Sequence, residues 1–142
     1  MKKESKTKQA LKLLKDAYSI ETPEDNVEYY KDFSKVYDDI YVEGMSYVYP
    51  KYVAKELISY YQEDGPICDI GCGTGLVGKE LNKLNSKLVI DGIDISSDML
   101  KVAGTKSVYR NLYSFDLTKP IKRIPMYYKA IISSGTFTHG HL

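Results

Sequence analysis

The stretch Pro66-Ile67-Cys68-Asp69-Ile70-Gly71-Cys72-Gly73-Thr74-Gly75 decides the fold of this chain. It starts with a short apolar run, continues with closely spaced glycines, and is followed from Leu76 by apolar residues at helical spacing. This order predicts a β-strand, a glycine turn and an α-helix. Glycine has no Cβ, so the main chain of such a turn can take a positive φ and a bound molecule can approach it closely. The stretch therefore predicts an α/β crevice that holds a nucleotide-like ligand at a strand end.

The glycines can be read in two registers. Counted from Gly73, residues 73–78 form a G-x-G-x-x-G, the dinucleotide pattern, which is weak when it stands alone. Counted from Asp69, the same stretch reads D-x-G-x-G-x-G. A second acid, Asp94, ends the next predicted strand (residues 88–94), 25 residues after Asp69. A carboxylate there suits the adjacent hydroxyl groups of a ribose under either register.

In the second register, residues 67–75 resemble the first motif of class I S-adenosylmethionine-dependent methyltransferases, and residues 92–100 resemble the second motif of that family. The resemblance implies a Rossmann-like, doubly wound α/β sheet and S-adenosylmethionine as the cofactor. In that family the first acid and the glycines lie near the methionine part, the second acid binds the ribose, and apolar residues with a third acid surround the adenine. The cofactor-binding residues implied here are Asp69, Gly71, Cys72, Gly73, Gly75, Asp94, Ile95, Met99, Asp116, Leu117, Ser134 and Tyr37.

Three of these positions also have a plainer interpretation. Asp116 could form an Asx-type turn before Lys119 rather than meet an adenine. Met99 could simply fill the core. Tyr37 belongs to a loose match with the family's tyrosine-rich entry helix, and it could only pack.

The segment Ser134-Gly135-Thr136-Phe137-Thr138-His139-Gly140-His141 resembles the T-H-G-H segment of methyltransferases of the Williams–Beuren-region type. The resemblance makes His139 and His141 candidate catalytic residues, because an imidazole can orient or deprotonate an acceptor group near neutral pH. Both could instead be structural. A His-x-His metal site needs further ligands, and the sequence offers no evident ones, so no metal is expected.

Length and composition predict one soluble globular domain. The chain has 142 residues, 43% of them hydrophobic, and a formal net charge of +1. This balance does not favour a nucleic-acid or membrane partner, and no apolar run approaches the length of a membrane span. A cytoplasmic location is expected. Cys68 and Cys72 are the only cysteines, and we interpret them as reduced structural thiols.

Two parts of the chain are expected. Residues 1–64 are predicted to form an N-terminal helical extension, with helices over about residues 6–18, 22–37 and 50–61. Residues 65–142 predict a partial cofactor-binding core with four strands, of which the third covers residues 108–112 and the fourth residues 128–135. In related small-molecule methyltransferases such an extension folds over the cofactor and shapes the acceptor pocket. Nine of the 14 tyrosines fall between Tyr29 and Tyr61, which suggests a small aromatic or apolar acceptor.

The resemblance covers only the front half of the family's catalytic domain. The fourth strand would then be an exposed apolar edge that can pair with another chain. The chain could be a fragment, could complete its sheet through self-association or another polypeptide, or could be a reduced relative that binds the ligand without turnover.

Three functions compete. The first is an S-adenosylmethionine-dependent methyltransferase, possibly truncated, that transfers a methyl group to a small-molecule acceptor. The second is a non-catalytic module that binds the cofactor or serves in assembly. The third is an NAD-dependent oxidoreductase, which is less favoured because Asp69, residues 92–100 and the final segment all follow the methyltransferase pattern.

Overall fold

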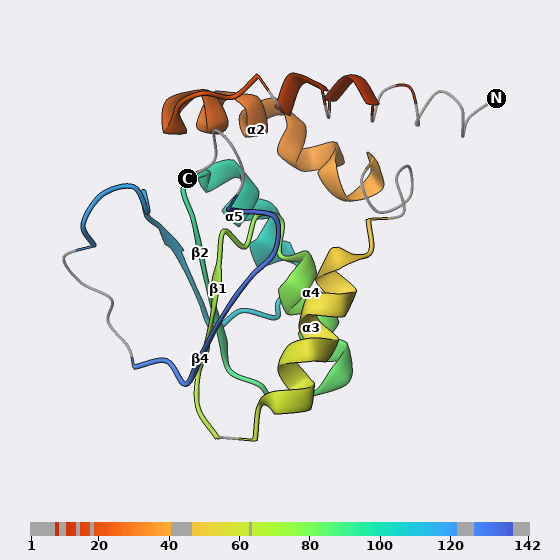
Figure 1. The fold of residues 1–142 in the computed structure, drawn as a ribbon, viewed down its shortest axis with the longest axis vertical. Coiled ribbons are helices and arrows are strands. Elements are labelled where there is room, and N and C mark those ends of the chain that lie inside the picture. The colour runs from red at the N-terminus through yellow and green to blue at the C-terminus, as the bar shows by residue number, and fades with distance from the viewer. Residues whose placement is uncertain are drawn as a thin grey trace.

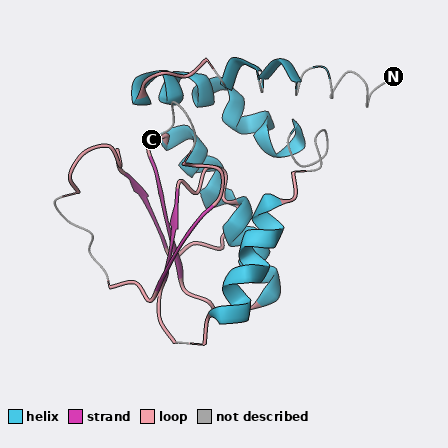
Figure 2. Cartoon of the chain, in the orientation of Figure 1, coloured by secondary structure: helices cyan, strands magenta, loops and turns pink. Residues whose placement is uncertain are grey.

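The structure is a computed structural model that describes residues 8, 11–13, 15–17, 19–40, 47–62, 64–121 and 127–137. Figure 1 traces the chain, and Figure 2 separates helices from strands. The labelled elements are α2 (Pro23–Asp38), α3 (Tyr49–Tyr60), β1 (Ile67–Ile70), α4 (Leu76–Leu84), β2 (Ile90–Asp94), α5 (Ser97–Thr105), β3 (Asn111–Ser114) and β4 (Ala130–Ser133). Strands and helices alternate from β1 to β3, as the sequence predicts for an α/β domain.

The four strands form one parallel sheet in the order β3-β2-β1-β4. Ile67 of β1 is paired with Ile90 of β2 and with Ala130 of β4. From β1 the chain continues to β2 and β3 on one side of the sheet, and β4 then pairs with β1 on the other side. Because all the strands are parallel, the carboxyl ends of β1, β2 and β4 lie side by side at one edge of the sheet. This is the switch point at which open α/β sheets bind ligands.

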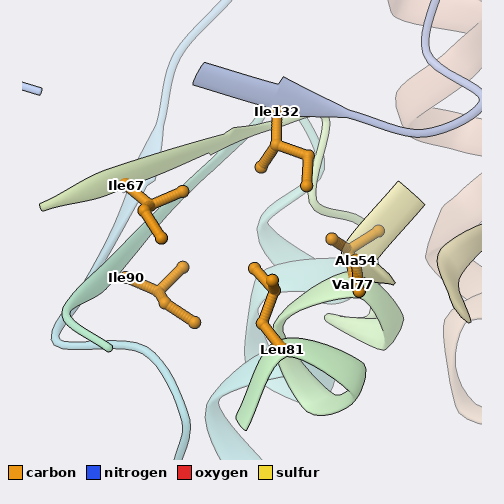
Figure 3. Close-up of a cluster of buried hydrophobic side chains, with 6 residues drawn as sticks. All are labelled: Ala54, Ile67, Val77, Leu81, Ile90 and Ile132. Carbon is orange, nitrogen blue, oxygen red and sulfur yellow. The ribbon is translucent and has the colours of Figure 1, made fainter. Parts of the chain in front are cut away.

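The main core lies between the sheet and helices α3 and α4. Its buried side chains come from one face of the strands and from both helices (Figure 3): Ala54, Ile67, Val77, Leu81, Ile90 and Ile132. Figure 1 shows α3, α4 and α5 on the same side of the sheet. Helix α3 therefore shares its core with the strands, although it was expected to belong to the extension of residues 1–64.

The segment before α3 has a smaller apolar cluster of its own. Phe33 and Ile40 are buried, and several tyrosines pack around them. Helix α2 begins with a reciprocal pair of hydrogen bonds, in which Asp25 N donates to Thr22 Oγ1 and Thr22 N donates to Asp25 Oδ2, each over 3.1 Å. These bonds fix the start of the helix that was predicted over about residues 22–37, because side-chain oxygens satisfy amide groups that the first helical turn leaves unpaired.

The opposite face of the sheet contains a buried carboxylate. Asp91 of β2 has 0% of its surface exposed. Its Oδ1 accepts hydrogen bonds from Arg110 Nε at 3.0 Å and from both nitrogens of Asn111, and its Oδ2 accepts from Arg110 Nη2 at 2.6 Å and from Tyr128 Oη at 3.0 Å. Arg110 and Asn111 precede or begin β3, and Tyr128 precedes β4. Asp91 therefore connects β2 to the chain at both edge strands.

Several predicted boundaries are confirmed, and one is wrong. Helix α4 covers Leu76–Leu84, so it begins where the sequence shows apolar residues at helical spacing. Ser96 caps α5 by accepting a hydrogen bond from Met99 N. The third strand, predicted over residues 108–112, instead covers Asn111–Ser114. The reason is local: Ser107 has a φ of 54°, and the following residues carry the Tyr109 side chain toward β1 before the strand begins.

No helix in the described part of the chain is long and apolar enough to cross a membrane.

Candidate functional site

A pocket lies at the carboxyl ends of the strands, and we call it the strand-end pocket. Its lining comes from α2 and the segment before α3, from the turns after β1 and β4, and from the segments after β2 and β3. The lining residues are Pro23, Tyr30, Tyr37, Tyr47, Gly71, Gly73, Asp94, Ile95, Met99, Phe115, Asp116, Leu117, Thr118, Ser134, Gly135 and Thr136. Nine of these are residues that the sequence predicted to bind the cofactor: Tyr37, Gly71, Gly73, Asp94, Ile95, Met99, Asp116, Leu117 and Ser134.

The floor of the pocket is the glycine turn, residues 71–75. Gly71 has a φ of 64°, and a Cβ built on it would lie 1.9 Å from Thr136 Oγ1. Gly73 has a φ of 52°, and among the described residues a Cβ on it would meet only Met99 Cε, at 3.8 Å. The backbone at Gly73 is therefore open toward the pocket. A molecule in the pocket can approach the main chain there, as the sequence predicted.

Asp94 joins the glycine turn to the start of α5. Its Oδ2 accepts a hydrogen bond from Gly73 N, and its Oδ1 accepts one from Ser96 N, both at 2.8 Å. The two amides hold the carboxylate at the mouth of the pocket. A carboxylate can accept about four hydrogen bonds, so these two do not exhaust its capacity for the hydroxyl groups of a ligand.

The far wall of the pocket combines apolar side chains with Asp116. Ile95, Met99, Phe115 and Leu117 supply the apolar surface. Asp116 Oδ1 accepts hydrogen bonds from Thr118 N and Thr118 Oγ1, and its Oδ2 lies 2.8 Å from Lys119 Nζ. The Lys119 and Thr118 contacts lower the pKa of Asp116 to about 2, so the carboxylate is ionised at neutral pH. Asp116 therefore forms the Asx-type turn and also lines the pocket, while its contact with an adenine stays a prediction.

The near wall is rich in tyrosine. Tyr30 and Tyr37 come from α2, and Tyr47 comes from the segment before α3. The hydroxyl of Tyr47 lies 3.5 Å from Ser134 Oγ in the turn after β4. Tyr37, which the sequence had placed near the cofactor, is thus part of the pocket.

Helix α2 is fixed to the glycine turn at its carboxyl end. Lys106 Nζ donates to Asp38 Oδ2 and to the carbonyl oxygen of Thr74, each over 2.6 Å, and Thr74 Oγ1 donates to Asp38 Oδ1. Lys106 is the residue that follows α5. Three segments of the pocket are therefore held together by one ion pair and one threonine.

Asp69 does not line the strand-end pocket, and its place beside the cofactor stays a prediction. The resemblance put this acid beside the methionine part of the cofactor, but its side chain has 0% of its surface exposed and does not line the strand-end pocket. Side chains alternate along a strand, so Asp69 points to the same face as Ile67, toward the helices. There its Oδ2 accepts a hydrogen bond from Tyr109 Oη at 2.7 Å. Burial raises the pKa of Asp69 to about 7, although the tyrosine bond lowers it.

Two further predicted residues lie beside the strand-end pocket rather than in it. Cys72 is buried and lines a small neighbouring hollow. Gly75 is the N-cap of α4, and a Cβ on it would lie 2.8 Å from the ring of Tyr109. Cys68 and Cys72 are both free and buried, and burial raises the pKa of the Cys68 thiol to about 11, which fits reduced structural thiols.

The candidate catalytic residues His139 and His141 lie outside the described residues. The described ranges contain no group of three or more His, Cys, Asp or Glu side chains that could hold a metal ion.

A parallel sheet with a glycine turn after its first strand, an acid at the end of the second and a pocket between them defines a Rossmann-like α/β domain of the nucleotide-binding type. Residues 67–141 match the family model described as a methyltransferase domain, and the chain belongs to this family.

Individual relatives agree with this assignment. Malonyl-(acyl-carrier protein) O-methyltransferase of Bacillus anthracis is 36% identical over 73 residues, which are 50% of this chain and 26% of that relative. A crystal structure from Methanococcus maripaludis, described as an S-adenosyl-L-methionine-dependent methyltransferase, is 25% identical with a TM-score of 0.57 and covers 75% of this chain and 50% of its own. A TehB-like methyltransferase of Corynebacterium glutamicum has a TM-score of 0.57 at 21% identity, and the match covers 74% of this chain and 56% of that methyltransferase.

These likenesses confirm the predicted Rossmann-like methyltransferase fold. The match nevertheless spans only 26% of the length of the Bacillus anthracis relative and 50% of the Methanococcus maripaludis chain.

Proposed function

We propose that this chain is the cofactor-binding part of an S-adenosylmethionine-dependent methyltransferase that acts on a small-molecule acceptor. The observation that carries the proposal is the bond between Gly73 N and Asp94 Oδ2. This bond holds a carboxylate, which is suited to ribose hydroxyls, beside the main chain of Gly73 in a pocket that also has apolar lining residues. Family membership supports the same activity.

The residues of the pocket fit an adenosyl ligand in their chemistry. Asp94 would accept the ribose hydroxyls, Ile95 and Met99 would enclose the flat base, and Asp116 would accept from its amino group. The main chain at Gly71 and Gly73 would pass beneath the methionine part, and Ser134 would lie toward the site of transfer. Solved relatives bind the demethylated product, as in the S-adenosylhomocysteine complex of the plantazolicin methyltransferase BpumL, whose TM-score to this chain is 0.51.

The tyrosines add a reason to expect a sulfonium cation. When bound, the cofactor supplies an activated methyl group on a positively charged sulfur. The rings of Tyr30, Tyr37 and Tyr47 belong to the same pocket, and the face of an aromatic ring attracts a cation. These side chains would exclude water and hold a small acceptor in line with the methyl group, which is the main requirement of a reaction that depends on alignment.

Calorimetric titration with S-adenosylhomocysteine tests the cofactor site. We expect saturable binding by the wild-type chain and an affinity loss of about tenfold or more in Asp94→Asn, because the variant removes the charge that accepts the hydroxyls. Asp98→Asn is the matched control: it makes the same change in the first turn of α5, outside the pocket lining, and should bind as the wild type does. No binding by folded wild-type protein would refute the proposed function.

Methyl transfer is tested separately, with S-adenosylmethionine labelled in its methyl group and a panel of small amines, alcohols, thiols and carboxylic acids. Transfer to one class of acceptor would support the enzyme and identify its chemistry. Binding without any transfer would instead support the non-catalytic module. Saturable binding of NAD, without binding of S-adenosylhomocysteine, would support the oxidoreductase.

Three finer predictions accompany the proposal. The Williams–Beuren-type segment with His139 and His141 stays a prediction, and His139→Ala and His141→Ala should lower transfer while sparing cofactor affinity.

Self-association through β4 is supported by its place at the edge of the described sheet and by the 66% exposure of Ile131; light scattering of wild type and Ile131→Lys would test it. A cytoplasmic location also stays a prediction.

A further inference from the structure

Tyr109 occupies the space that three glycines leave open behind the glycine turn. A Cβ on Gly75 would lie 2.8 Å from Tyr109 Cε2, a Cβ on Gly78 would lie 2.5 Å from Cζ and from the hydroxyl, and a Cβ on Gly92 would lie 3.1 Å from Cε1. The ring therefore fits beside Gly75 and Gly78 only because these two positions lack a side chain, and a side chain at Gly92 would crowd it. Gly78, the last glycine of the G-x-G-x-x-G register, makes room for this tyrosine.

The hydroxyl of Tyr109 joins the two ends of the turn. It donates to Asp69 Oδ2 at 2.7 Å, at the end of β1, and it accepts from Gly78 N at 3.2 Å, in the first turn of α4. Helix α4 has no side-chain cap of its own at Gly75. Because the first amides of a helix lack partners within the helix, Tyr109 supplies from a distance what a capping residue would supply locally.

Asp69 depends on this contact. Its carboxyl group is fully buried, and its Oδ1 has no hydrogen-bond partner among the described residues. Burial raises the pKa of Tyr109 well above its usual value, with the Asp69 charge as a further cause, so the phenol keeps its proton and remains a donor. Neither side chain lines the strand-end pocket.

We propose that Tyr109 is a positioning residue that holds the glycine turn in its binding conformation by bonding Asp69 on one side and Gly78 on the other. The proposal rests on the proposed function, because the turn it holds is the one assigned to the cofactor. Tyr109 would act on cofactor affinity through the main chain of residues 71–75, without touching the ligand. In this proposal Asp69 is the acceptor that holds the Tyr109 hydroxyl beneath the turn.

The test compares Tyr109→Phe with Tyr128→Phe. Each variant removes one phenol hydroxyl from a bond to a buried strand aspartate, Asp69 in the first case and Asp91 in the second, but only Tyr109 contacts the turn. Two quantities are measured in the whole chain: the affinity for S-adenosylhomocysteine by calorimetry, and the hydrogen exchange of peptides covering residues 70–78 without ligand. The melting temperature of each variant shows whether the two substitutions destabilise the fold equally.

For Tyr109→Phe we expect an affinity loss of about tenfold and faster exchange in residues 70–78. For Tyr128→Phe we expect a similar fall in melting temperature, an affinity within about twofold of the wild type and unchanged exchange in that segment. Unaltered affinity and exchange in Tyr109→Phe would overturn this inference alone, as would equal losses in both variants. Failure of the wild type to bind S-adenosylhomocysteine would overturn the proposed function instead, and the exchange data would then decide whether Tyr109 holds the turn.

Discussion

Replacing Arg110 with methionine should destabilise the fold through the carboxylate that it leaves behind. Asp91 has 0% of its surface exposed, and Arg110 contacts both of its oxygens. Methionine keeps most of the aliphatic stem but leaves a buried charge that, within the described part of the chain, has only Asn111 and Tyr128 as donors. Removing one partner of a buried ion pair costs about 3–5 kcal/mol. The Arg110 side chain is 35% exposed, so water can replace part of the contact, and we expect a loss of about 2 kcal/mol.

Urea unfolding of the single and double variants measures this cost. Asp91→Asn alone should also cost about 2 kcal/mol, while the double variant Asp91→Asn/Arg110→Met should cost about the same as either single change, because neither charge is then left without the other. The expected coupling energy is therefore about 1.5–2 kcal/mol. Glu80→Gln, which breaks the pair with Lys83 on the outer surface of α4, is the control and should change stability by no more than about 0.5 kcal/mol.

The same pair predicts a pH dependence. Burial by itself raises the pKa of Asp91, but the bonds from Arg110 and Tyr128 outweigh it and leave the pKa below its usual value. The stability that Asp91 contributes is therefore complete above about pH 4 and is lost as the pH falls through the lowered pKa of the folded state. The difference in free energy of unfolding between wild type and Arg110→Met should shrink below that pH. A coupling energy under about 0.5 kcal/mol, or a difference that is independent of pH, would refute this account.

Three further predictions concern the pocket. Gly71→Ala should cost about 2 kcal/mol or more, because its φ is positive and Thr136 fills the space, whereas Gly104→Ala in α5, with nothing nearer than 3.7 Å, should gain about 0.5–1 kcal/mol in urea unfolding. Asp69→Asn should raise stability more at pH 8 than at pH 5, since an acid whose folded pKa is raised to about 7 loses its contribution as the pH rises through that value; an equal change at both would contradict the burial argument. Lys106→Met should weaken S-adenosylhomocysteine binding by severalfold and raise the proteolysis rate of α2, because the bond to Asp38 holds that helix to the turn; unchanged proteolysis would exclude this link.

Local sequence signals predicted the elements around the pocket well. The start of α4 at Leu76 followed from the helical spacing of the apolar residues after the glycine turn. The alignment of the strand ends followed from the parallel α/β order alone, and it was enough to bring Gly73 and Asp94 into contact. These features depend on residues that are close in sequence or on a general rule of topology.

The supports behind the pocket could not be predicted in this way. Tyr109 meets Asp69 across 40 positions of sequence, and Lys106 meets Asp38 across 68. The two partners of each pair lie in different elements, so the periodicity of hydrophobic residues within one element does not indicate the contact between them. One signal was available: Gly92 within a predicted strand indicates that something approaches the backbone closely. In the structure the side chains of Cys72 and Leu112 do so, and the ring of Tyr109 follows at a slightly greater distance.

The two buried aspartates of neighbouring strands show how the same residue type serves opposite needs. Asp91 is paired with a guanidinium and two neutral donors, so its charge is compensated and it fastens the edge strands to the sheet. Asp69 has one phenol as its described hydrogen-bond partner, and burial dominates its pKa. An uncompensated buried carboxyl costs stability, so its presence beside the glycine turn needs a local benefit. A donor and acceptor relay from β1 through Tyr109 to α4 provides one, because it fixes both ends of the turn that the ligand must meet.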